Sequence, residues 1–198
     1  MQNGRELVVE HWFVVLGSDS GVADDFVISM TTTFVDSPLG LVRITGDELG
    51  VSVISCTDVP PYERLLSTRP DDEQAGPVRL AVDQLGEYFA GTRQTFDFPM
   101  TPVGTAFQQT VWRALQTVPF GTTVSYLLLS RQLGDEKAIR AVAAANGRNP
   151  LWIVVPCHRI IGSDGSLTGY AGGLWRKRWL LEHEGALPGA KTGQTSLF

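Results

Sequence analysis

The sequence predicts an α+β fold in two domains: an N-terminal β-meander domain with one helix and a helical C-terminal domain. Short β-rich runs separated by turn signals fill residues 31–56, whereas apolar residues recur at helical spacing in much of residues 105–184. Charge divides in the same region: residues 1–103 carry 6 Lys and Arg against 16 Asp and Glu, and residues 104–185 carry 9 against 5. The chain, at 198 residues, is long enough for two small cores.

The expected organisation has four segments. Residues 1–29 form an extension of no evident fold, and Met30 is an alternative start of the folded protein. Residues 30–101 form the N-terminal α/β domain and residues 102–186 the C-terminal domain, with a polar, proline-containing linker between them. Residues 187–198 are predicted to be a flexible tail.

In the first domain, "TTTFVDSPLGLVRITGDELGVSVISC" contains strand-forming runs separated by "DSPLG" and "GDELG". Both separators are turn signals, so the segment predicts a β-meander. The next element, residues 77–90, places apolar side chains at helical periodicity, and Gly91 ends it.

The second domain begins with a helix predicted over residues 105–117. Its apolar stripe, with Trp112 beside it, is expected to face the core and consists of Phe107, Val111, Leu115 and Val118. Helices over about 124–133 and 137–146 follow, with a turn at Gly134 and Asp135 between them. This pattern predicts a helix-turn-helix, although an ordinary helical hairpin shows the same pattern. A final helix over 174–184 is expected to direct Leu174 and Leu181 inward.

The second of the paired helices has the composition of a DNA-contacting element. Several of its residues are alanines, which allow another backbone to approach closely, and basic side chains stand among them at Lys137, Arg140 and Arg148. Small residues permit groove contact and basic residues meet phosphate. A plain solvated surface remains an alternative, because the excess of positive charge is modest.

Other classes of protein are disfavoured by composition. Two cysteines a hundred positions apart are poor material for a disulfide framework or a structural zinc site, which points to the cytoplasm and to no metal. We see no signal peptide and no apolar run long enough for a membrane span. Cys56 lies in a β segment and is expected to be inert core.

The stretch "VVPCHRIIG" raises the question of chemistry. Cys157 is either a structural thiol or a nucleophile, and a useful nucleophile needs a nearby base or positive charge. His158 and Arg159 follow at once, but His158 could act on the thiol only through a tight turn or a bridging water. An acid should orient the histidine, and spacing does not choose among the candidates, which are Asp135, Glu136, Asp164, Glu182 and Glu184.

Several separated motifs, in order, resemble one family. "FGTTVSY", "KAIRAVAAANGRNP" and "NPLWIVVPCHRIIGSDGSLTGYAGGLWRKRWLLEHEG" are similar to segments of the O6-alkylguanine-DNA alkyltransferases, whose hallmark is Pro-Cys-His-Arg. The resemblance covers residues 31–185. It implies an RNase H-like N-terminal domain and a winged helix-turn-helix C-terminal domain that binds the DNA minor groove.

The resemblance also implies the chemistry. The protein would rotate O6-alkylguanine, with O4-alkylthymine as a second candidate lesion, out of double-stranded DNA and move the alkyl group irreversibly to Cys157, once per molecule and without a cofactor. His158 would deprotonate the thiol through a water, Glu184 would hold the imidazole, and Asn149 would brace the turn. Arg140 would fill the gap in the base stack. The remaining positions expected to contact DNA or the base are Tyr126, Ala141, Trp152, Ile160, Tyr170, Ala171, Gly172 and Lys177.

Two departures from the family pattern affect these expectations. Ala171 stands where some relatives carry serine, which leaves the backbone N–H of the loop to contact guanine. Trp152 stands where some members have a smaller residue, so we expect a pocket that favours methyl over benzyl groups. The cysteines of the zinc site found in some relatives are lacking.

Two rival functions remain open. One is a non-catalytic relative that binds alkylated bases, and such relatives lack the acceptor cysteine that Cys157 provides. The other is an unrelated cysteine hydrolase, which leaves the alanine-rich basic helix unexplained. A monomer is expected. At the C-terminus, Gln194, Leu197 and Phe198 resemble the Q-x-x-L-F peptide that binds the DNA sliding clamp, although a frayed tail whose terminal Leu and Phe fold back on the domain is the commoner outcome for so short a pattern.

Overall fold

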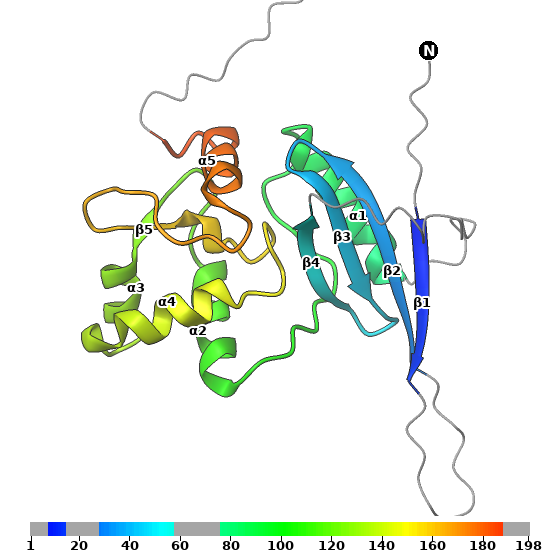
Figure 1. Ribbon diagram of the computed structural model, residues 1–198, viewed down its shortest axis with the longest axis horizontal. Coiled ribbons are helices and arrows are strands. Elements are labelled where there is room, and N and C mark those ends of the chain that lie inside the picture. The colour runs from blue at the N-terminus through cyan, green and yellow to red at the C-terminus, as the bar shows by residue number, and fades with distance from the viewer. Residues whose placement is uncertain (1–7, 15–27, 58–75, 188–198) are drawn as a thin grey trace, which may run out of the picture. The chain divides into compact units, whose positions relative to one another are not determined.

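The computed structural model describes residues 8–14, 28–57 and 76–187 (Figure 1). The chain divides into two compact units, Met1–Pro102 and Val103–Phe198. Each unit has its own described core, as expected for two domains. The units are therefore treated separately.

The first unit contains an antiparallel sheet in the order β1-β2-β3-β4 (Figure 1). Its strands are β1 (Val8–Val14), β2 (Ile28–Ser37), β3 (Gly40–Gly46) and β4 (Val51–Thr57). The β2–β3 hairpin closes at Ser37 and Gly40, and Gly40 has a φ of 92°, which a residue with a Cβ adopts only with strain. The meander predicted over residues 31–56 is confirmed, but the sequence analysis did not predict β1.

Helix α1 (Gly76–Phe89) packs on β2, β3 and β4 and ends before Gly91, close to the predicted bounds. The core between helix and sheet is apolar, since Val42, Ile44, Ile54 and Leu85 are almost wholly buried. Cys56, expected in this core, is only partly buried on β4.

The second unit begins with α2 (Ala106–Gln116), whose N-terminus is closed by a capping box between Thr105 and Gln108. Val111 and Leu115 are buried as predicted, but Phe107 is 43% exposed. Phe107 lies in the first turn of α2, before the helix reaches the packed interface, so its place in the apolar stripe was wrongly assigned.

Trp112 fixes α2 against the next helix pair, because its indole N–H donates to the carbonyl of Ala145 at 2.9 Å.

The predicted pair of helices consists of α3 (Tyr126–Gln132) and α4 (Ile139–Gly147), which pack together. The turn is where it was expected: Gly134 has a φ of 89°, and the carboxylate of Asp135 accepts from the backbone N–H of Lys137. Both starts differ from the prediction. A short 3-10 turn, η2 (Glu136–Ala138), precedes α4, and residues 124–125 form a strand instead of helix.

That strand, β5 (Val124–Ser125), pairs in parallel with β6 (Ile160–Ile161). A 3-10 turn, η3 (Cys157–Arg159), directly precedes β6, whereas α3 directly follows β5. The pairing therefore holds the start of α3, and with it Tyr126, beside the turn that carries Cys157.

The last element is α5 (Leu174–His183), which contacts η3. Leu181 is buried as predicted, whereas Leu174 is 49% exposed, because it is the first residue of the helix and lies beyond the packed contact. Arg176 and Lys177 occupy the interior instead. None of the described helices is both long and apolar enough to cross a membrane.

Candidate active site

Cys157 lies in a turn that the side chain of Asn149 holds in place. The amide Nδ2 of Asn149 donates to the carbonyl of Val155 at 2.7 Å and to Sγ of Cys157 at 3.1 Å, and Oδ1 accepts from the backbone N–H of Leu151. Between these contacts Ile153 has a φ of 73°, a strained conformation for a β-branched residue. The Asn149 hydrogen bonds thus hold a turn that a free chain would avoid.

The Cys157 thiol is enclosed, with only 3% of the residue exposed. Burial raises the pKa of this thiol to about 11, although the Asn149 hydrogen bond and the charge of Lys177 act in the opposite direction. The group is therefore a thiol, not a thiolate, at neutral pH, and a base must take its proton when it reacts.

His158 and Glu184 form a buried pair next to the thiol. Nε2 of His158 lies 2.8 Å from Oε1 of Glu184, and neither side chain is exposed. Burial lowers the pKa of His158, with the charges of Arg159 and Lys177 acting the same way against the raising effect of Glu184. A neutral imidazole that donates from Nε2 to a carboxylate has its lone pair on Nδ1.

The Nδ1 atom of His158 is buried and has no hydrogen-bond partner among the described residues. Among the described residues the imidazole of His158 makes a hydrogen bond to Glu184 and none to the Cys157 thiol, which receives a hydrogen bond from the backbone N–H of His158 instead. The imidazole is thus neutral and oriented by a carboxylate, and the lone pair of its Nδ1 atom is available to accept a proton. These are the properties that general-base catalysis requires.

Arg159 binds the same carboxylate. Its Nε and Nη2 atoms donate to the two oxygens of Glu184 at 2.8 and 3.1 Å, and Nη1 donates to the carbonyl of Val118. Although burial raises the pKa of Glu184, the hydrogen bonds and charges of His158 and Arg159 outweigh it and lower the pKa to about 2. From its position two residues after Cys157, Arg159 was a candidate for the charge that activates the thiol. The structure shows that its guanidinium is instead committed to Glu184.

Lys177 is the cation that does influence the thiol. It is completely buried in α5, and its Nζ atom donates to the carbonyls of Ile160 at 2.5 Å and Thr168 at 2.6 Å. Burial lowers the pKa of Lys177 to about 8, against the charge of Cys157. The side chain was expected among the DNA contacts, but in the structure it joins β6 to the loop that contains Thr168.

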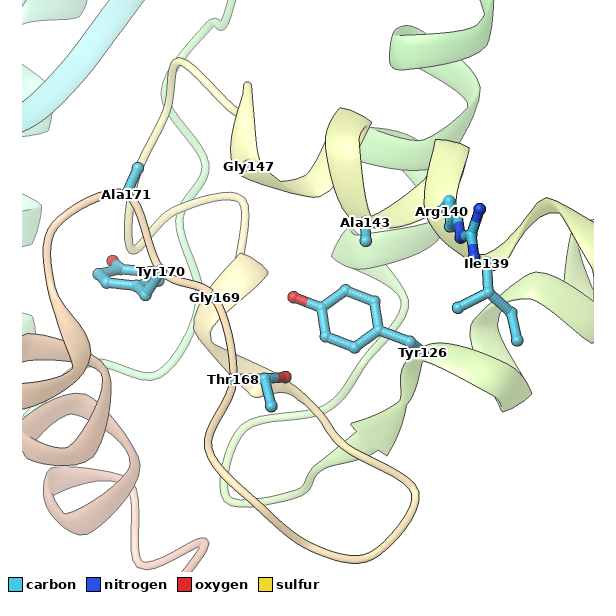
Figure 2. Close-up of a pocket in the computed structure, with 9 residues that line it drawn as sticks. All are labelled: Tyr126, Ile139, Arg140, Ala143, Gly147, Thr168, Gly169, Tyr170 and Ala171. Carbon is cyan, nitrogen blue, oxygen red and sulfur yellow. The ribbon is translucent and has the colours of Figure 1, made fainter.

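A pocket of about 460 Å³ lies beside α3 and α4 (Figure 2). Its walls come from the start of α3, the length of α4 and the loop after β6, and its lining residues are Tyr126, Ile139, Arg140, Ala143, Gly147, Thr168, Gly169, Tyr170 and Ala171. Figure 2 shows the ring of Tyr126 between α4 and the Thr168–Gly169 segment, with its hydroxyl directed into this space.

Four of the predicted DNA or base contacts therefore line one pocket: Tyr126, Arg140, Tyr170 and Ala171. The lining set does not include Ala141, Trp152, Ile160, Gly172 or Lys177. Trp152 packs instead on the ring of Tyr170, with centroids 5.5 Å apart, and on Gly172, where an added Cβ would lie 2.6 Å from the indole.

The basic side chains expected at DNA, those of Lys137, Arg140 and Arg148, are all exposed around α4. Ala141 is exposed between them, so backbone can approach this face of the helix.

Sequence reasoning missed one polar residue of this region, Asn146. It is buried at the end of α4, and its amide donates to the hydroxyl of Tyr126 at 3.1 Å and to the carbonyl of Cys157 at 3.5 Å. Its position in an alanine-rich helix, three residues before Asn149, was the available signal. A polar residue among alanines in a buried position generally has hydrogen-bond partners.

Comparison with known proteins gives a consistent result. The family model "6-O-methylguanine DNA methyltransferase, DNA binding domain" matches residues 106–186. A methylated-DNA–protein-cysteine methyltransferase of Mycolicibacterium paratuberculosis is 47% identical over 150 residues, which are 76% of this chain and 89% of that protein. One of Shigella flexneri is 50% identical over 64% of this chain and 70% of its own length.

The chain belongs to the methylated-DNA–protein-cysteine methyltransferase family.

Solved structures agree. The crystal structure of the Mycobacterium tuberculosis O6-methylguanine methyltransferase matches 79% of this chain and 93% of its own at 42% identity, with a TM-score of 0.64. The same Mycobacterium tuberculosis protein in complex with DNA matches with a TM-score of 0.66. These findings confirm the predicted α+β fold, the predicted family and the predicted enzyme class, a DNA-binding methyltransferase of DNA repair.

Proposed function

We propose that this methyltransferase moves the alkyl group of O6-alkylguanine in double-stranded DNA to Sγ of Cys157. The observation that carries the proposal is the arrangement around the thiol. A buried cysteine shares its turn with a neutral histidine held by Glu184, and β5–β6 pairing holds this turn beside a pocket walled by the helix-turn-helix.

The reaction needs one proton transfer and one displacement. His158 takes the thiol proton, through a bridging water, on the lone pair of Nδ1, and the sulfur attacks the alkyl carbon of the lesion. The S–C bond forms as the bond from carbon to guanine O6 breaks, and the leaving guanine recovers a proton. The product is a thioether. Because it has no carbonyl for water to attack, the protein reacts once.

Access to the lesion requires base extrusion, since O6 lies on a base edge inside the duplex. Unstacking costs a few kcal/mol. Arg140, which is exposed and lines the pocket, would fill the gap from the minor groove. The extruded base would lie against Tyr126 and the loop of Tyr170, Ala171 and Gly172, with the carbonyl of Ile160 as a further acceptor. Ala141 provides the small face that lets DNA approach.

Lys177 supports this function indirectly. Its contacts to the carbonyls of Ile160 and Thr168 fix the segment that would read the base, and its positive charge favours the thiolate. Asn149 supports it by holding the Cys157 turn.

The test is intact-protein mass spectrometry after incubation with duplex DNA that contains O6-methylguanine. We expect one added methyl group per protein, mapped to Cys157, and none on the Cys157→Ala variant. Cys56→Ala is the matched control and should react as the wild type does. Several lesions cleared per molecule, or repair by Cys157→Ala, would overturn the proposal. Unmodified protein that only binds the lesion would favour a non-catalytic relative, and an acyl substrate hydrolysed with turnover would favour a hydrolase.

Further properties of this function stay predictions: a monomer in the cytoplasm, and repair of O4-alkylthymine as a second lesion. Clamp binding through Gln194, Leu197 and Phe198 also stays a prediction, since these residues lie outside the described part of the chain. Deleting residues 194–198 should abolish binding to purified sliding clamp and leave alkyl transfer intact. An unchanged affinity for the clamp would refute it.

A further inference from the structure

Asn146 connects the two halves of the candidate site. The residue is buried at the end of α4, and its side-chain amide reaches both Tyr126, which lines the pocket, and the backbone of the reactive turn at Cys157. Neither the family roles stated above nor the comparisons assign it a function.

The direction of these hydrogen bonds follows from the chemistry of the partners. The carbonyl oxygen of Cys157 only accepts, so the Asn146 atom 3.5 Å away must be Nδ2 and not Oδ1. The same Nδ2 atom lies 3.1 Å from the hydroxyl oxygen of Tyr126. The tyrosine oxygen therefore accepts from Asn146, and its own hydrogen remains available to a molecule in the pocket.

This arrangement polarises the phenol as well as orienting it. Burial raises the pKa of Tyr126, the charge of Cys157 raises it further, and the Asn146 hydrogen bond lowers it. A donor to the phenol oxygen makes the hydroxyl a better hydrogen-bond donor to the next group in the chain. Figure 2 shows this hydroxyl directed toward the space between α4 and the loop at Gly169.

We propose that Asn146 is a positioning residue that commits the Tyr126 hydroxyl to donate toward the extruded base. The inference rests on the proposed function. It assigns Asn146 to the step in which negative charge develops on the leaving guanine, where a donated hydrogen bond has its greatest effect.

The second hydrogen-bonding atom of Asn146 supports a role beyond packing. Oδ1 is buried without a hydrogen-bond partner in the described part of the chain. A buried acceptor left unpaired costs about 1–3 kcal/mol, which the two hydrogen bonds from Nδ2 must offset. The contribution of Asn146 therefore comes from the groups that Nδ2 binds and not from packing.

The test compares Asn146→Leu, which keeps the branching of the side chain and removes the Nδ2 donor, with Tyr126→Phe and with the double variant. Alkyl transfer to Cys157 is followed by mass spectrometry under single-turnover conditions at saturating O6-methylguanine duplex, and Kd for the same duplex is measured separately. We expect Asn146→Leu to slow transfer about tenfold at saturation, the effect of about one hydrogen bond. Its Kd should stay near that of the wild type.

The double variant gives the decisive comparison. If Asn146 acts through the Tyr126 hydroxyl, the double variant should transfer within about twofold of Tyr126→Phe alone, because the target of the hydrogen bond is already absent. Three outcomes would overturn the inference. In the first, the rate losses of the two single variants multiply in the double variant. In the others, Asn146→Leu transfers at the wild-type rate, or it weakens only duplex binding, as a higher Kd with an unchanged rate at saturation. If Asn146→Leu does not fold, Asn146→Ala replaces it in the same measurements, because the helix already accommodates several alanines.

Failure of this inference is separable from failure of the proposed function. A wild-type protein that methylates Cys157 normally while Asn146→Leu does so at the same rate would remove only the role of Asn146. A wild-type protein that acquires no methyl group would remove the proposed function itself.

Discussion

Oε1 of Glu184 lies 2.8 Å from Nε2 of His158, and both carboxylate oxygens of Glu184 accept hydrogen bonds from the guanidinium of Arg159. All three residues belong to the second unit. Three charged or titratable side chains thus form one buried cluster in which the negative charge of Glu184 is matched by Arg159 and the imidazole stays neutral. The cluster sets the tautomer of the candidate base.

Replacing Glu184 with Gln should destabilise the protein and change how its stability depends on pH. A buried Arg159 without its counter-charge should cost about 3–5 kcal/mol at pH 7. Because the folded pKa of Glu184, about 2, lies below its ordinary value, the wild-type carboxylate contributes stability above about pH 4.5 that is lost as pH falls toward 2. Denaturant unfolding between pH 2 and 7, in steps of roughly one pH unit, measures both effects.

Glu182→Gln is the matched control for that experiment. Glu182 is exposed on α5, 3.8 Å from Arg178, so its removal should change stability by less than about 1 kcal/mol. Equal losses for the two variants, or an unaltered acid dependence in Glu184→Gln, would contradict the assignment of the Glu184 cluster.

Asn149→Ala should release the Cys157 turn. The variant loses hydrogen bonds to Leu151, Val155 and the thiol, and nothing then compensates the positive φ of Ile153. We expect a loss of about 2–3 kcal/mol in the free energy of unfolding, together with slower alkyl transfer. Ser166→Ala, in an exposed loop, should stay within about 0.5 kcal/mol of the wild type in the same measurements. An unfolding midpoint for Asn149→Ala equal to that of the wild type would show that the Cys157 turn does not depend on the Asn149 hydrogen bonds.

Arg140→Ala should weaken repair without weakening the fold. Arg140 is exposed at the edge of the pocket, so its loss should leave thermal unfolding unchanged. Without a side chain to fill the gap in the base stack, extrusion should cost more, and we expect transfer from O6-methylguanine duplex to slow by about tenfold or more. Arg113→Ala, an exposed arginine on α2, controls for lost charge. If Arg140→Ala and Arg113→Ala slow alkyl transfer by the same factor, Arg140 contributes only its positive charge and does not fill the gap in the base stack.

Trp152→Ala should broaden the range of lesions. The indole of Trp152 packs on Tyr170 and fills the space beside Gly172, in the loop expected to contact guanine. Removing it should raise the rate for O6-benzylguanine relative to O6-methylguanine by about tenfold, a size typical of changes in an apolar pocket. Competition between the two lesions measures the ratio directly, with Trp175→Ala, an exposed tryptophan, as control. Equal rates for both lesions in the wild type would contradict a methyl preference.

The helices of the second unit could be predicted from the sequence because their signals are local. Thr105 caps α2, Gly134 turns the chain between α3 and α4, and apolar spacing identifies the buried faces at Val111 and Leu115. Phe107 and Leu174 were misplaced because periodicity identifies a face of a helix but not where along it the neighbouring element ends.

The buried polar groups could not be predicted from pattern. Lys177 is interior because two carbonyls, of Ile160 and Thr168, meet at its Nζ, and their positions depend on the turn at Cys157 and on β5–β6 pairing. The guanidinium of Arg159 binds the carboxylate of Glu184, which lies 25 positions away in the sequence. Asn146 was missed for the same reason, since its partners come from α3 and η3. Long-range contacts of this kind have no periodic signature.

In the small parallel sheet, Val124 pairs with Ile160 and Ser125 with Ile161, so backbone pairing joins the start of α3 to the segment that follows Cys157. Because this pairing uses backbone atoms, replacing exposed side chains on α3, such as that of Gln132, should leave intact the link that holds Tyr126 near the Cys157 turn.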